Sequence, residues 1–104
     1  MANDGESFLD AMQNARLVAN AEAYYRSMYK GYTSSWNMRD SHMFDTICSL
    51  LDFKQQHDEK PAKIVIWEHN SHIGDARATS MSARGEHNVG QLWRLLITGV
   101  NQCK

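Results

Sequence analysis

KIVIWEHNSHIGD, residues 63–75, determines the fold class that the sequence predicts. Its four bulky residues in a row, Ile64–Trp67, favour a strand whose two faces are both covered, as in a parallel sheet. A polar cluster, Glu68–His72, follows this strand at once. In open α/β sheets, ligands bind just beyond the carboxyl ends of the strands. The order of residues therefore predicts a functional loop at this point of the chain.

Composition limits the classes of function. The 104 residues allow one domain at most, and 42% of hydrophobic residues can form a core. Eleven basic and twelve acidic residues leave a formal charge of -1 without a basic face, which argues against nucleic acid or a membrane surface as partner. No apolar run approaches the roughly 20 residues that span a bilayer, and the start of the chain lacks the features of a signal peptide. Two cysteines are too few for a disulfide framework, so a reducing, cytoplasmic location is expected.

Hydrophobic periodicity predicts helices on both sides of the expected strand. Apolar residues at spacings of three and four indicate a long helix over residues 5–30 and a second over residues 38–55. A shorter amphipathic helix is expected over residues 88–97. The turn-rich segment 31–37 is predicted to connect the first two helices, because glycine and hydroxyl residues gather in it.

The expected fold class is therefore α/β, with helices packed on a small, parallel sheet. A polar loop over residues 54–63 would lead into the strand, and residues 76–86 would form a mobile or lid-like loop after it. One strand cannot form a sheet by itself. Either further strands lie in residues 76–104, or the chain pairs with another copy, or it is an incomplete portion of a larger α/β hydrolase-like domain.

Two histidines, a carboxylate and an amide within five residues offer proton transfer and hydrogen bonding near neutral pH. A structural interpretation competes with this one, in which His69 and His72 are partly buried and bonded to the backbone. A third interpretation makes both histidines metal ligands, with Glu68 and Asp75 supplying oxygen atoms. The spacing of these residues does not choose among the three.

Arg39 is a further candidate, because it lies one turn before Met43 on the inward-leaning side of the second helix. Its guanidinium could reach the polar loop, pair with Asp40 or Asp45, or extend along the surface to water.

Motifs spread over residues 20–94 resemble a known family. They are YYR at Tyr24–Arg26, WNMRDSHM at Trp36–Met43, WxHNSHIGDARAT at Trp67–Thr79 and RGExNxGQL at Arg84–Leu92. In this order they closely resemble the carboxy-terminal half of the erythromycin esterase-like family. The resemblance implies a largely α/β fold around a deep cleft and the hydrolysis of a small-molecule ester, the macrolide lactone in some members. It implies water activated by a histidine, with glutamates and a second histidine assisting and with no metal or other cofactor.

The resemblance also assigns roles to single residues. The HNSH, GExN and RDxxM elements carry the residues expected to serve catalysis, which are His69, His72, Glu86 and Arg39. Residues expected to bind substrate or support the site are Asp40, Asn70 and Asn88, together with Glu68, which is not part of the family pattern.

Departures from the family pattern qualify this expectation. Glu68 stands where relatives carry alanine, and if it lies close to His69 it favours the protonated imidazole, a better acid than base. After Arg94 the chain reads LLITGVNQCK, which resembles a truncated or frameshifted ending. The histidine assigned as the main base belongs to the amino-terminal half of the family, which has no counterpart in the matched segments. The partners expected are therefore that missing half or a second copy, and the alternatives are a non-catalytic truncated remnant and a metal-binding histidine loop.

Overall fold

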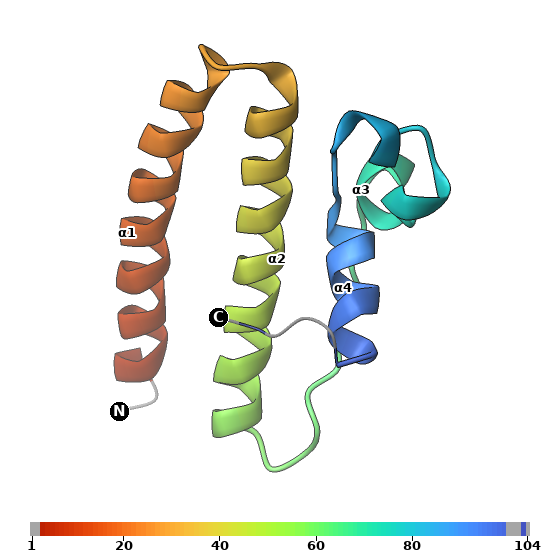
Figure 1. The fold of residues 1–104 in the computed structure, drawn as a ribbon. Coiled ribbons are helices and arrows are strands. Elements are labelled where there is room, and N and C mark those ends of the chain that lie inside the picture. The colour runs from red at the N-terminus through yellow and green to blue at the C-terminus, as the bar shows by residue number, and fades with distance from the viewer. Residues whose placement is uncertain (1–2, 100–102, 104) are drawn as a thin grey trace.

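A computed structural model describes residues 3–99 and 103 as a set of helices, of which two are long (Figure 1). In chain order the elements are α1 (Asn3–Met28), α2 (Tyr32–His57), α3 (Asn70–Ile73), the 3-10 turns η1 (Ala76–Ala78) and η2 (Ser82–Arg84), and α4 (Val89–Ile97). The long α2 is central, with α1 along one side and α4 along the other.

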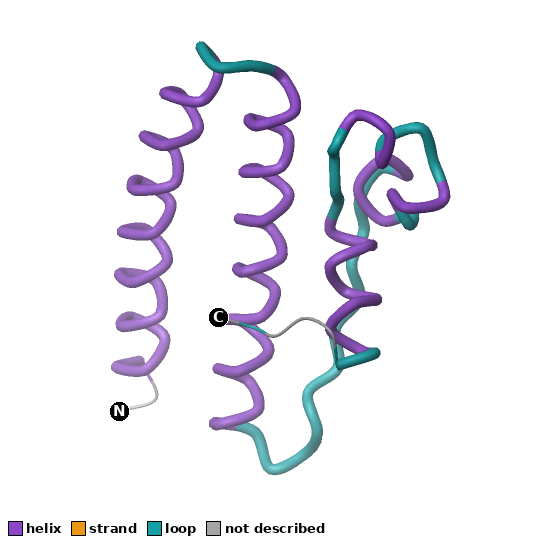
Figure 2. Tube along the Cα trace, viewed as in Figure 1, coloured by secondary structure: helices purple, strands orange, loops and turns teal. Residues whose placement is uncertain are grey.

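The predicted α/β fold with a parallel sheet is wrong for this chain. No strand occurs among residues 3–99 and 103, which are helix and loop throughout (Figure 2). The apolar run is an extended connection in which exposure alternates: Val65 and Trp67 are 94% and 96% exposed, whereas Ile66 and Glu68 are half-buried. This alternation is that of a strand. The segment is nevertheless not part of a sheet, because no second extended segment of the described chain lies beside it to exchange backbone hydrogen bonds.

The helices were predicted well, apart from their ends. The segment predicted as a turn, residues 31–37, is mostly the first two turns of α2, in which the Ser35 hydroxyl donates to the carbonyl of Tyr32 at 2.9 Å. The reversal between α1 and α2 is short because Gly31 adopts φ +141°, a conformation that L side chains rarely adopt. At its other end, α2 continues to His57 and so takes in the start of the predicted 54–63 loop.

The core lies between α2 and the carboxy-terminal part of the chain. Phe44 of α2 meets Trp93 of α4 edge to face, with ring centroids 6.4 Å apart. By contrast α1 exposes many apolar side chains, such as Val18 at 69%. The buried apolar side chains are Leu9, Phe44, Ile47, Cys48, Ala76, Met81 and Val89.

Two close contacts hold the carboxy-terminal part, one within it and one to α2. Gly90, at the start of α4, lies so near the end of α3 that an added Cβ would be 2.1 Å from the carbonyl oxygen of Ile73. Cys48 of α2 forms a disulfide with Cys103, although two cysteines had predicted no disulfide framework. Among the described residues, no helix is both long enough and apolar enough to cross a membrane.

Candidate active site

The polar cluster after the extended segment folds into the single turn α3. His69 is its N-cap: the side-chain Nδ1 accepts from the backbone N–H of Ser71 at 3.2 Å and lies 2.9 Å from the Ser71 hydroxyl. This local bonding directs the His69 ring to its own turn and leaves it exposed. His72, at the third position of this turn, instead directs its ring toward Asp40 of α2.

His72 and Asp40 form the central contact of the site. The Nδ1 atom of His72 lies 3.0 Å and 3.1 Å from the two carboxylate oxygens of Asp40. Asp40 is fully buried, and its Oδ2 also accepts from the backbone N–H of Val89 at 3.0 Å. Burying a carboxylate is unfavourable unless donors surround it, and these bonds supply the donors. Because a carboxylate only accepts, the His72 tautomer with hydrogen on Nδ1 is the favoured one.

Trp36 fixes the plane of the same imidazole. The rings of Trp36 and His72 are stacked, with centroids 4.8 Å apart and an angle of 3° between planes. Trp36 is itself held, since its Nε1–H donates to the carbonyl of His87 at 2.7 Å. Trp36 and Asp40 are four residues apart on α2 and therefore lie on one face, where they hold His72 from its ring face and its edge.

The other nitrogen of His72, Nε2, makes no hydrogen bond within the described part of the chain, and the side chain is 16% exposed. An imidazole with a fixed orientation, a carboxylate at Nδ1 and an unoccupied Nε2 can take or give a proton at that nitrogen.

The RGEHN segment, residues 84–88, supports the His72–Asp40 pair. Glu86 is 4% exposed, and its two oxygens accept from Arg84, at 3.0 Å from Nη2 and 3.2 Å from Nε. This contact raises the pKa of Arg84. Asn88, 1% exposed, caps α4 by accepting from the N–H of Gln91 at 2.9 Å, and its Nδ2 donates to the carbonyl of Ser71 at 2.8 Å. Asn88 thereby fixes α3 against the start of α4.

The family model described as Erythromycin esterase matches residues 1–96. The chain belongs to this family. The match confirms the resemblance seen in the sequence motifs and extends it to the whole of α1. No solved structure matches the chain.

In this member of the erythromycin esterase family, sequence reasoning missed part of the site. The hydrogen bonds between α2 and the RGEHN segment include those of Asn37, whose Oδ1 accepts from the N–H of His87 at 2.9 Å and whose Nδ2 donates to the carbonyl of Gly85 at 2.9 Å. Ser41 bonds Nε2 of His87 at 2.9 Å. The sequence WNMRDS did contain a signal for these residues. Trp36 with Asp40, and Asn37 with Ser41, are pairs at a spacing of four residues, which places each pair on one face of a helix.

Other residues predicted for the site take no part in the contact between His72 and Asp40. Arg39 is exposed, its guanidinium carbon is 6.0 Å from the centroid of Trp36, and it makes no hydrogen bond or ion pair with the described residues. It does not reach the polar loop, because it is one position away from the Trp36–Asp40 face of the helix. Asn70 is exposed as well. Glu68 makes no hydrogen bond to His69 within the described chain, and its Oε2 is buried without a partner there.

Acidic and histidine side chains do not gather into a metal centre in the part of the chain that the structure describes, where no group of three or more such ligands occurs. Asp75, suggested as an oxygen ligand, is held instead by Arg77 through two bonds of 2.9 Å and 2.8 Å. The hydrogen bonds from Arg77 lower the pKa of Asp75 to about 2.

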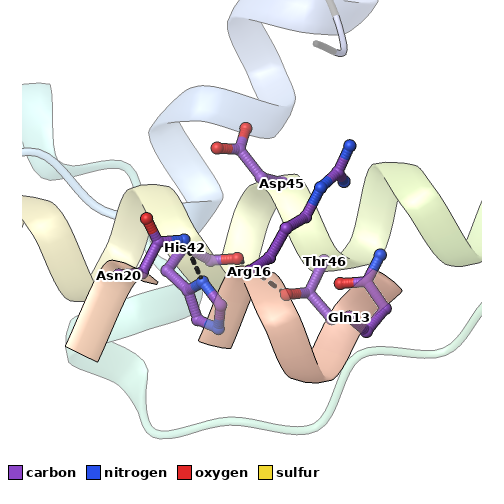
Figure 3. A pocket seen from close by; sticks show the side chains of 6 residues that line it. All are labelled: Gln13, Arg16, Asn20, His42, Asp45 and Thr46. Atoms are coloured by element: carbon purple, nitrogen blue, oxygen red, sulfur yellow. Dashed lines mark hydrogen bonds between the residues drawn. The ribbon is translucent and has the colours of Figure 1, made fainter. Parts of the chain in front are cut away.

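A separate polar hollow of about 260 Å³ lies between α1 and α2 (Figure 3). In it, Asn20 Nδ2 donates to Nδ1 of His42 at 2.7 Å, and Arg16 donates to the Ser49 hydroxyl at 2.7 Å. None of the eight residues predicted for the esterase site lines it. The residues that do are Gln13, Arg16, Asn20, His42, Asp45 and Thr46.

Proposed function

We propose that this chain supplies an acid–base histidine to the hydrolysis of a carboxylic ester, with a macrolide lactone as the substrate class. The observation that carries the proposal is the bonding of His72 Nδ1 to both oxygens of the buried Asp40, while Nε2 makes no hydrogen bond with the residues that the structure describes. Membership of the erythromycin esterase family supports the reaction class.

In the proposed step, water attacks the ester carbonyl carbon and a tetrahedral intermediate forms. His72 Nε2 takes a proton from the attacking water or returns one to the leaving alkoxide oxygen, so the C–O bond breaks without a free alkoxide. Asp40 keeps the proton on Nδ1 and stabilises the imidazolium while it exists. Assistance of this kind contributes typically ~10²–10⁴-fold when the groups converge on the ester.

We expect the isolated chain to hydrolyse esters weakly or not at all. Residues that act as a unit lose most of their effect when one is removed. Within the described chain, the carboxylate of Glu86 is already paired with Arg84, and Arg39 does not face His72. His69, Glu86 and Arg39 therefore remain proposed participants that need further groups beside them.

The test compares hydrolysis of a chromogenic ester and of a macrolide lactone by the wild type and its variants. His72→Ala should reduce any hydrolysis to the rate in buffer, and Asp40→Asn should lower it strongly while His72 is still present. His57→Ala is the matched control, because His57 is exposed and bonds only its own helix, at the carbonyl of Phe53. In a longer protein that contains this chain, His69→Ala or His72→Ala should abolish activity.

Efficient lactone opening that survives both His69→Ala and His72→Ala would refute the assignment. A wild-type rate equal to that of buffer, in the chain alone and in a longer protein, would favour the non-catalytic alternative. A readout that needs no turnover is the tautomer of His72: two-bond ¹H–¹⁵N spectra should show hydrogen on Nδ1 in the wild type and on Nε2 in Asp40→Asn.

A further inference from the structure

The extended segment formed by residues 63–68 has two free edges. None of its backbone N–H or C=O groups makes a hydrogen bond with the described residues, and the nearest backbone bond is from Ala62 to the side chain of Gln55 at 3.2 Å. Val65 and Trp67 are almost fully exposed. A row of unpaired backbone groups carrying β-branched and aromatic side chains is a template for another strand.

We propose that two copies of this chain associate by pairing these segments antiparallel around a two-fold axis, with Val65 opposite Val65 of the second copy. Opposite residues in an antiparallel pair project to the same side. The two Val65 side chains then contact each other on the exposed side of the pair. On the other side, Ile64 lies opposite Ile66 of the second copy. A two-fold pair of this kind is closed, since each copy offers the same surface.

Charge supports the antiparallel direction. Lys63 begins the segment and Glu68 ends it, so parallel pairing in register would place each charge against its like. Like charges directly opposite each other destabilise a sheet. In the proposed register, Lys63 instead stands opposite Trp67 of the second copy, where its alkyl stem and ammonium can contact the indole ring.

The neighbouring two-fold registers are less favourable. Centring the pair on Ile66 places Ile64 opposite Glu68, which sets a carboxylate against an apolar side chain. Centring it on Ile64 brings Pro61 opposite Trp67, and proline has no N–H to contribute to the ladder. Val65 at the centre avoids both problems.

Cysteine cross-linking tests the register directly. The two copies of residue 65 would have Cα atoms about 4.5–5.5 Å apart, within the range that a disulfide bridges. Val65→Cys should therefore form a covalent dimer under mild oxidation, seen on a non-reducing gel. Trp67→Cys and Lys63→Cys are controls on the same exposed side. In each of these variants the two cysteines of the dimer would be offset by four residues along the strands, too far apart to form a disulfide. Equal cross-linking of all three would overturn the proposed register.

The mass in solution tests the association itself, without any measurement of hydrolysis. The wild type should approach twice 11.9 kDa as concentration rises in sedimentation or light-scattering experiments. Val65→Lys should shift the chain to monomer, whereas Val18→Lys, an equivalent change on the exposed side of α1, should not. A wild type that stays monomeric, or open-ended growth beyond the dimer, would overturn the closed pair.

Discussion

Replacing Asp40 by alanine removes a buried carboxylate that bonds both His72 and the first turn of α4. The N–H of Val89 then loses its acceptor, and Val89 is only 1% exposed, so water does not easily replace it. A buried donor left without a partner costs about 1–3 kcal/mol. His72 is 16% exposed and can turn toward water, so its lost bond should add only about 1 kcal/mol.

The expected decrease in the free energy of unfolding is therefore about 2–4 kcal/mol, against about 5–15 kcal/mol for a typical domain. With a urea dependence of about 2 kcal/mol per molar, the middle of the usual range, the midpoint of urea unfolding should fall by about 1–2 M. Circular dichroism at increasing urea measures this directly. Asp40→Asn keeps an oxygen for Val89 and should cost clearly less.

Asp45→Ala is the matched control for Asp40→Ala, because Asp45 is on the same helix and its carboxylate makes no hydrogen bond or ion pair in the described chain. Its urea midpoint should stay close to that of the wild type. Equal loss in Asp40→Ala and Asp45→Ala would refute the view that Asp40 anchors α4.

Three further predictions concern the contacts around α4 and α3. Gly90→Ala should destabilise the chain by at least about 1–3 kcal/mol, seen in thermal unfolding, because the new methyl would collide with the carbonyl of Ile73. Asn88→Ala should lower the free energy of unfolding by the ~1 kcal/mol of a lost N-cap and also remove the bond from Asn88 Nδ2 to the carbonyl of Ser71. Asn88→Asp should keep the cap but not that second bond, because a carboxylate has no N–H to donate. The Asp75–Arg77 pair should stabilise the fold at pH values above 3.8, the ordinary pKa of Asp75, and lose its effect as pH falls to about 2. Stability measured against pH for Asp75→Asn should therefore differ from that of the wild type above this window and merge with it below.

The sequence predicted the long helices because their apolar spacing depends on local structure alone. The strand predicted for residues 64–67 was wrong for the opposite reason, since a strand depends on distant parts of the chain. Val65 and Trp67 have the residue types of a strand, and their exposure alternates with that of Ile66, but strand formation requires a partner that local composition does not reveal. The turn predicted over residues 31–37 was wrong because serine and threonine favour turns only weakly and can also form hydrogen bonds within the first turns of a helix.

The candidate site was predicted in outline. The HNSH run and Asp40 were identified, and the structure joins His72 to Asp40. Which of the two histidines faces inward depended on the single turn α3, whose N-cap is His69, and such a short element has no periodic signal. Arg39 was misplaced because a spacing of four from Met43 suggested the inward side, whereas the face that meets His72 is the one defined by Trp36.

The disulfide between Cys48 and Cys103 links residues 55 positions apart in the sequence and closes a covalent ring that contains α3, both 3-10 turns and α4. His72 lies inside this ring and Asp40 lies outside it. In the loop-entropy description, a ring of this length disfavours the unfolded chain by about 4 kcal/mol. Reduction of the disulfide should therefore loosen the segment that carries His69 and His72, whereas the packing of α1 on α2 should persist. The His72–Asp40 bond joins a residue inside this ring to one outside it, so we expect this contact to respond to the redox state of the surroundings.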